Sequence, residues 1–215
     1  MKQLLKKEFT LAAHPTNYIF PALSALILVP NYPYYVTFFY TGLGIFFMCL
    51  SGRENRDLEY SLMLPVGKAD IVSARLLFCG MLEAAQLILA CLFAALRSRL
   101  GMEPNVVGME PNAAFFGISL VMMAVFNHVF FSIYFSDPRK VGKAFVLSSI
   151  AVFVFICAAE ASAHAIPFVR DVLDTQFPAY PVQKLAVFAV GLIVYVIWGI
   201  LLHKKCRRTF VSIDL

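Results

Sequence analysis

The sequence predicts an all-α, polytopic membrane protein with six transmembrane helices, an N-terminal interfacial helix and a short cytoplasmic helix. Of its 215 residues, 60% are hydrophobic and only 14% are charged. The mean hydropathy is +0.77, well above that of soluble domains. The 21 Phe and 9 Tyr would leave apolar surface that water does not tolerate, whereas lipid favours such surface. A soluble globular fold is therefore excluded.

Each predicted span is an apolar run, to be compared with the roughly 20 residues that a helix needs to cross the hydrocarbon. The cores of the runs are residues 18–29, 34–50, 71–96, 113–135, 144–166 and 185–202. The first run is short and contains Pro21, which a spanning helix tolerates where neighbours satisfy the freed carbonyl. Five spans remain an alternative to six.

The distribution of Lys and Arg predicts the orientation, because these residues accumulate on the cytoplasmic side of a membrane. With both termini inside, fourteen basic residues are cytoplasmic and four are external: Arg97, Arg99, Arg170 and Lys184. The net charge of +5 therefore orients the chain in the lipid bilayer. It does not indicate a nucleic-acid partner. The five cysteines show no disulfide or metal-ligand spacing and are expected to be free thiols.

The whole chain, residues 1–215, is predicted to be one transmembrane domain. Residues 1–14 are expected to form the interfacial helix, because apolar residues recur there at helical spacing: Met1, Leu4, Leu5, Phe9 and Ala12. The outer loops are residues 97–112 and 167–184, and residues 203–215 form a cytoplasmic tail. A tandem Gly-Met-Glu-Pro-Asn repeat in the first outer loop indicates a local duplication in a tolerant loop. The second is expected to carry a short surface helix with the apolar residues Phe168, Val169, Val172, Leu173 and Phe177.

Residues 51–70 predict a charged cytoplasmic elbow. Ser51 and Glu54 have the spacing of a capping box, so a helix is expected to start there and to end at Pro65. Asp70 is expected to cap the third span, whose first turns would project into the cytosol with Arg75. A projecting, charged elbow suits docking to a soluble partner. The alternative is an ordinary solvated loop.

Residues 59–75, with the sequence EYSLMLPVGKADIVSAR, resemble a segment of type-2 ABC exporter permeases, particularly the small six-span subunits that export peptides, toxins and antibiotics in bacteria. The motif covers about thirty residues, and the six-span layout extends the resemblance along the chain. Gly67-Lys68 stands where the family often has Ser or Thr with a basic residue, a mild departure. The resemblance implies that the elbow is a coupling helix, seated in a groove of an ATPase subunit. The docking residues would be Arg53, Glu54, Arg56, Asp57, Leu58, Glu59 and Tyr60.

The same resemblance implies that one chain is half of an exporter in the bacterial cytoplasmic membrane. Two membrane chains, identical or related, would work with two ABC ATPase chains that bind ATP and magnesium. This chain itself offers no ATP site, because Ala69 follows Gly67-Lys68 and Leu62 stands where a P-loop needs its first Gly. No cofactor is expected in this chain.

Six polar residues are predicted to lie within spans: Glu83, Gln86, Asn127, His128, Glu160 and His164. An ionisable group there costs about 2.5–3.5 kcal/mol on insertion scales, so it normally faces a bundle interior or a wet cavity. These residues either hold the helices together or line a substrate path. Small residues around Glu160 could bury a hydrogen bond to His164. No metal site is predicted, because Cys157, Glu160 and His164 have no visible fourth ligand.

The sequence therefore favours a permease subunit of an ABC exporter that moves an apolar or amphipathic substrate, such as a peptide. No catalytic residue is predicted, because Ser119 lacks the following Gly of a nucleophile elbow. Two alternatives remain open. One is the membrane-embedded binding component of a vitamin importer, which has about six spans but no coupling elbow. The other is an intramembrane enzyme.

Overall fold

The computed structural model describes residues 2–176 and 178–213; Met1, Phe177, Asp214 and Leu215 lie outside the described residues. Within these ranges the chain is helical and has no strand. Among the described residues, five helices are long and apolar enough to cross a membrane: α3 (Tyr35–Glu54), α5 (Lys68–Arg99), α6 (Ala113–Tyr134), α7 (Val141–Ala165, preceded by the short helix η3, Pro138–Lys140) and α8 (Pro181–Val211). The predicted class, an all-α polytopic membrane protein, is confirmed.

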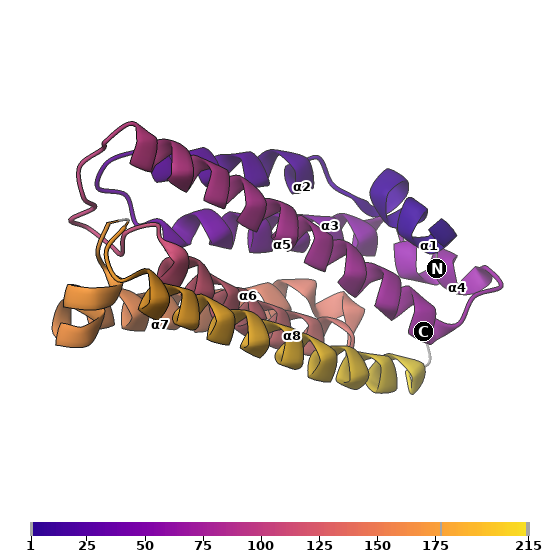
Figure 1. The fold of residues 1–215 in the computed structure, drawn as a ribbon. Coiled ribbons are helices and arrows are strands. Elements are labelled where there is room, and N and C mark those ends of the chain that lie inside the picture. The colour runs from indigo at the N-terminus through magenta and orange to yellow at the C-terminus, as the bar shows by residue number, and fades with distance from the viewer. Residues whose placement is uncertain (1, 177, 214–215) are drawn as a thin grey trace.

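The long helices lie side by side along one axis and alternate in direction (Figure 1). Both ends of the drawn chain lie at the same end of the bundle as α4 (Asp57–Met63), and we call this the basal end. The loop between α5 and α6 lies at the opposite, distal end. This arrangement places the predicted elbow and the predicted outer loops at opposite ends of the molecule.

The first apolar run is shorter than the other five. It consists of α2 (Thr16–Ile19, 4 residues) and the 3₁₀ helix η2 (Phe20–Leu28, 9 residues). A 3₁₀ run of this length is unusual, and Pro21 stands at its start. η2 packs against α3 and α5, so it is part of the bundle. The structure thus has five full-length spans and a sixth, shorter apolar segment.

The N-terminal segment is helical, as predicted, in α1 (Lys2–Lys7) and the π-helical η1 (Glu8–Ala12). Its apolar face packs on the bundle: Leu4 and Ala12 are buried, and the Phe9 and Phe78 rings meet edge to face with centroids 4.8 Å apart. Lys7 and Glu8 are also buried, which the amphipathic pattern does not predict. The segment therefore contributes charge to the interior as well as an apolar face.

α6 is the centre of the bundle, with 67% of its apolar stretch buried against 11% for α8. The two helices come into backbone contact at a pair of glycines. A Cβ added to Gly191 would lie 2.1 Å from the carbonyl oxygen of Gly117, and one added to Gly117 would lie 2.6 Å from the carbonyl oxygen of Val187. Only glycine fits at this crossing, as at the small-residue contacts of other membrane helices.

The distal loop between α5 and α6 is folded onto the bundle. Asn105, Met109 and Glu110 are buried, and Asn112 caps α6 by accepting hydrogen bonds from the backbone N–H groups of Ala114 (2.9 Å) and Phe115 (3.2 Å). The interpretation of this segment as a tolerant loop is therefore wrong. Repeats carry no information about burial, and the polar side chains of this one find partners on other elements.

The second distal loop contains the predicted short helix as η4 (Val169–Leu173), while the predicted Phe177 lies outside the described residues. α8 begins at Pro181, so Lys184 lies within the helix, not in the loop. Lys184 is buried and its ammonium donates to the backbone carbonyls of Thr175 (2.6 Å) and Gln176 (3.3 Å). At the other end, α8 continues to Val211 and takes up most of the predicted tail.

Candidate functional site

An exposed elbow at the basal end joins α3 to α5 through α4. α4 begins after Arg56, whose φ of 53° lies in the left-handed region and reverses the chain direction. It ends at Met63, and the extended C-cap residue Leu64 stands directly before Pro65, where the helix was predicted to end. The sequence therefore locates this helix correctly at its C-terminal end and places its start too early.

Both predicted helix caps are wrong. Ser51 lies inside α3, which continues without a break to Glu54, so its side chain has no free helix terminus to cap. Asp70 is the third residue of α5, after the N-cap Gly67, and no side chain caps α5. At that position a carboxylate still interacts favourably with the helix dipole.

The seven predicted docking residues divide between two faces of the elbow. The exposed ones are Arg53, Glu54, Arg56, Glu59 and Tyr60. Leu58 is buried in the core, and the Asp57 side chain is only 11% exposed. A helix of this kind turns one stripe toward the bundle, so these two residues support the elbow from within and are not part of its outer surface. Met63, which the sequence analysis did not single out, is 82% exposed beside this outer face.

Four charged side chains form a buried cluster directly beneath the elbow. Arg75 on α5 donates from Nε to Glu8 Oε2 (2.5 Å) and from Nη2 to Glu8 Oε1 (3.3 Å), and it also pairs with Asp57 of α4. Lys7 pairs with Asp57 and, at 3.3 Å, with Glu8. Two cations thus meet two anions, and the cluster joins the N-terminal helices, α4 and α5.

The expectation that Arg75 projects into the cytosol is wrong, because its side chain is 0% exposed. A buried guanidinium is tolerated only when carboxylates pair with it, and Glu8 and Asp57 do so here. Burial alone would raise the pKa of Asp57, but the charges of Arg75 and Lys7 outweigh that effect and lower it below its ordinary value. Asp57 is therefore held in its ionised form.

A hollow of about 320 Å³ opens beside the elbow, between the N-terminal segment and the α3–α4 junction. Its lining includes Leu11, His14, Asn55, Asp57 and Tyr60. Tyr60 of α4 thus forms part of its wall. The elbow helix α4 therefore lies beside a hollow in the protein surface.

Within the spans, Glu83 lies at the centre of a polar contact between three helices. Asn127 on α6 donates from Nδ2 to both carboxylate oxygens, at 2.8 Å and 3.0 Å. The Tyr195 hydroxyl on α8 donates to Glu83 Oε2 at 2.5 Å. The sequence identified Glu83 and Asn127, but it gave no reason to select Tyr195, whose position in an apolar run is typical of a lipid-facing aromatic.

The remaining predicted residues of the membrane interior are separate from this contact. Gln86 accepts a hydrogen bond from Thr41 (3.0 Å) and donates to the carbonyl of Thr37 (3.2 Å), which ties α5 to α3. His128 Nδ1 accepts from Trp198 Nε1 (3.0 Å), which ties α6 to α8. These two contacts fit the interpretation of interior polar residues as links between helices.

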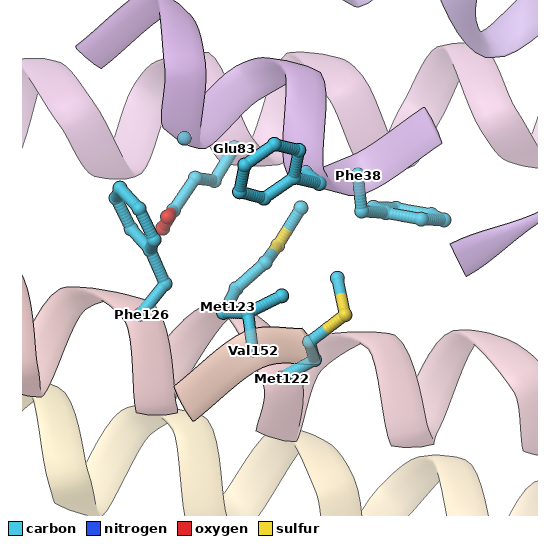
Figure 2. A pocket seen from close by; sticks show the side chains of 8 residues that line it. Phe38, Glu83, Met122, Met123, Phe126 and Val152 are labelled. Atoms are coloured by element: carbon cyan, nitrogen blue, oxygen red, sulfur yellow. The ribbon is translucent and has the colours of Figure 1, made fainter. Parts of the chain in front are cut away.

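Glu83 separates two spaces of different size. On one side is an apolar cavity of about 10 Å³, which holds at most one water molecule. Figure 2 shows the Glu83 carboxylate near the Phe126 ring, among side chains that include Phe38, Met122, Met123 and Val152. On the other side is a groove of about 380 Å³ between α5, α6 and α8. Of the two spaces beside Glu83, only the groove is large enough for an organic ligand.

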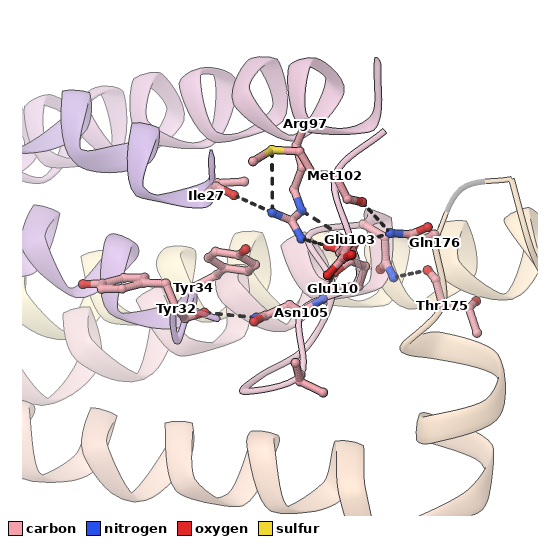
Figure 3. A network of polar contacts seen from close by, with 12 residues as sticks. Ile27, Tyr32, Tyr34, Arg97, Met102, Glu103, Asn105, Glu110, Thr175 and Gln176 are labelled. Atoms are coloured by element: carbon pink, nitrogen blue, oxygen red, sulfur yellow. Dashed lines mark hydrogen bonds and ion pairs between the residues drawn. The ribbon is translucent and has the colours of Figure 1, made fainter. Parts of the chain in front are cut away.

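The distal end holds a second polar network, centred on Arg97 (Figure 3). Arg97 Nε lies 3.6 Å from Glu110 Oε1, and the guanidinium also donates to the carbonyls of Glu103 and Ile27. Glu110 Oε2 accepts from the backbone N–H of Asn105 at 3.0 Å. The network binds the distal loop to α5 and η2.

The same loop reaches η4 and α7 through two further carboxylates. Asp174 accepts from the backbone N–H of Glu110 at 2.7 Å, and Glu160 accepts from that of Met109 at 3.1 Å. Burial raises the pKa of Asp174, although the hydrogen bond from the Glu110 backbone opposes the rise. The partner predicted for Glu160 is wrong: the loop backbone takes the place of His164, whose side chain is exposed.

Among the described residues, no group of three or more His, Cys, Asp and Glu side chains is placed to hold a metal ion.

The fold and the two ends of the bundle define a polytopic helical membrane protein with an exposed basal elbow and a closed distal end. A family model described as "ABC-2 family transporter protein" matches residues 3–203, and the chain belongs to this family. No curated protein and no solved structure matches the chain. The chain is thus a membrane permease of an ABC transporter, a transport subunit that works with an ABC ATPase subunit.

Proposed function

We propose that this chain is the permease of an ABC exporter that moves an apolar or amphipathic substrate, such as a peptide, out of a bacterial cell. Two such chains, identical or related, work with two ATPase chains, which bind ATP and magnesium. The termini and the elbow face the cytoplasm, in line with the fourteen basic residues of the cytoplasmic side. Family membership supports the transport role.

The observation that carries the proposal is the elbow and its buried support. Its outer face combines charged side chains, Arg53, Arg56 and Glu59, with the apolar Tyr60 and Met63. Interfaces of this composition pair an aromatic anchor with charges that select the partner. The ATPase is proposed to seat this face in a groove and to use the hollow beside Tyr60.

The buried cluster gives the elbow a way to transmit movement. A displacement of α4 acts on Asp57, which is paired with Arg75 of α5 and Lys7 of α1. Separating these pairs would leave unpaired charges in the interior, at a cost of several kcal/mol. α4, α5 and the N-terminal helices are therefore proposed to move as one body when the ATPase closes.

The proposal is tested by combining Tyr60→Ala with Arg56→Glu. Both side chains are exposed and lie outside the spans, so the protein should insert and fold as before. Losing the anchor and reversing one charge should cost about 2 kcal/mol or more of binding free energy, which is about a thirtyfold loss of affinity. Copurification of the partner ABC ATPase and ATP-dependent transport should both fall.

The control pairs Lys143→Glu with Val146→Ala, the same kinds of change on the exposed face of α7. This variant should keep wild-type copurification. Wild-type copurification and transport in the elbow variant would show that the elbow is a solvated loop, and the proposal would fail.

A further inference from the structure

The groove between α5, α6 and α8 opens from the side of the bundle. Exposed apolar side chains of α5 and α8 border its mouth, among them Leu77, Val196 and Ile200. The groove runs from Ser73 and His203, whose side chains are 2.8 Å apart near the basal end, to Glu83 and Tyr195 near the middle of the spans. Ten residues of α5 separate Ser73 from Glu83, a rise of about 15 Å.

Glu83 differs from the other buried acids described above. Glu8 and Asp57 are paired with Arg75, and Glu110 is paired with Arg97. Glu83 is only 3% exposed, yet its partners in the described chain are neutral donors, Asn127 and Tyr195. A buried carboxylate without a cation is costly, and a cation brought by a ligand would remove that cost.

The hydrogen bonding around Glu83 also leaves room for a donor. A carboxylate offers about four acceptor positions, and Glu83 uses three of them, two for Asn127 and one for Tyr195. Asn127 Oδ1 is buried and accepts no hydrogen bond from any described residue. An ammonium group has three donors and could bond the carboxylate and the amide oxygen together.

The rest of the groove is suited to an apolar chain. Its walls include Leu76, Leu77, Val196 and Ile200, with Trp198 as the largest aromatic surface. At about 380 Å³ the groove is of the size of small-molecule sites. An anionic headgroup is disfavoured, because it would be placed against Glu83 in a low-dielectric environment.

We propose that this groove binds lipophilic amines, with the ammonium at Glu83 and Asn127 and the apolar chain along Trp198 toward the basal end. The inference rests on the proposed function, because it names the substrate class of the permease. A peptide with one amine and apolar side chains belongs to this class. The separate acid Glu160 is not part of the site, because the distal loop covers it.

Trp198 is the only tryptophan of the chain and lines the groove, so tryptophan fluorescence can report binding there. The purified chain, in detergent micelles and without an ATPase, is titrated with ω-bromoundecylamine, whose bromine quenches tryptophan on contact. Quenching should saturate and should be reversed by decylamine. ω-Bromoundecanoate, which has the same chain length and the opposite charge, should give only the weak, linear quenching that arises from the micelle.

Two variants test the site. Glu83→Gln keeps the shape and removes the charge, and it should raise the Kd for the amine about tenfold. Gly199→Leu places a side chain in open space at the groove wall, so it should fold and obstruct binding. The matched controls are Glu103→Gln, an exposed acid of the distal loop, and Gly142→Leu, a glycine with open space elsewhere. Both should keep the wild-type Kd.

Equal quenching by the amine and the carboxylate would overturn the proposal and indicate a lipid or detergent groove. An unchanged Kd in both Glu83→Gln and Gly199→Leu would also overturn it. Because no ATPase is present, a failure here leaves the docking test untouched. Saturable amine binding by a chain that fails to copurify with its ATPase would reject the proposed function alone.

Discussion

At the scale of residues, the charge of Asp57 stabilises the fold by pairing with two cations. It lies at the start of α4, outside the spans, and it accepts from Arg75 and Lys7 at once. Its pKa is lowered despite its burial, since the two cations act more strongly than desolvation. A group whose pKa is lower in the folded state binds fewer protons there, so it stabilises the fold more as the pH rises.

Asp57→Asn should therefore destabilise the protein in a pH-dependent way. At neutral pH the variant leaves Arg75 and Lys7 with one carboxylate fewer, and its melting temperature should fall by several degrees. The difference from wild type should be complete above about pH 4 and should shrink as the pH falls through the folded pKa. Melting curves in detergent between neutral and acidic pH check this. A difference that grows in acid would contradict the assignment.

Arg75 and Glu8 mark the limit of what the sequence predicts at this scale. They are 67 positions apart in the chain, and no local pattern connects them. The sequence shows only that Arg75 stands near the start of an apolar run and that Glu8 follows Lys7 in an amphipathic helix. Neither pattern indicates that Arg75 and Glu8 form an ion pair. By contrast, Glu83 and Asn127 could be selected from the sequence, because a polar residue in the middle of an apolar run is unusual.

At the scale of elements, the crossing of α6 and α8 depends on Gly117 and Gly191. The backbones touch there, and this contact brings Tyr195 toward Glu83 and Trp198 toward His128. Hydropathy identified both helices as spans, but it carries no information on which helices touch. The elbow shows the same limit: Pro65 marked the end of α4, whereas its start depends on a left-handed Arg56.

Gly191→Ala should separate the two helices. Its Cβ would lie 2.1 Å from a backbone oxygen that no side-chain rotation can move. We expect a loss of about 1–3 kcal/mol or more of stability. Gly199→Ala in the same helix has no atom within 4 Å of the new Cβ, and it should be neutral or stabilising by about 0.5–1 kcal/mol. Thermal unfolding of both variants under one condition makes the comparison, and equal melting temperatures would contradict the close crossing.

At the scale of the whole molecule, the two ends of the bundle differ in kind. The basal end presents an exposed helix over a neutral ion cluster, whereas the distal end is closed by a loop whose buried groups bind α5, η2, η4 and α7. This contrast fits the proposed function, in which the ATPase acts on the elbow at the basal end. Charge counting predicted which end faces the cytoplasm, and this orientation can be measured directly.

In a variant without the native cysteines, a Cys at position 104 should react with an impermeant thiol reagent added outside intact cells. A Cys at position 140 should react only after the membrane is opened. Pro104 lies in the loop before α6 and Lys140 in the connection after α6, so the length of α6 separates them. Both residues are exposed, so accessibility within the protein does not bias the comparison. Labelling of position 140 alone would show the reverse orientation. Labelling of both positions from outside would exclude the proposed topology.

The tight winding of η2 relates this protein to the thickness of its membrane. Because a 3₁₀ helix rises about 2.0 Å per residue against about 1.5 Å in an α-helix, α2 and η2 together reach about 24 Å, whereas an all-α segment would reach about 20 Å. The stretched segment thereby reduces its hydrophobic mismatch with a hydrocarbon layer of about 30 Å. Lipids with shorter acyl chains reduce this mismatch, so we expect η2 to be the first element to return to α-helical geometry in a thinner bilayer.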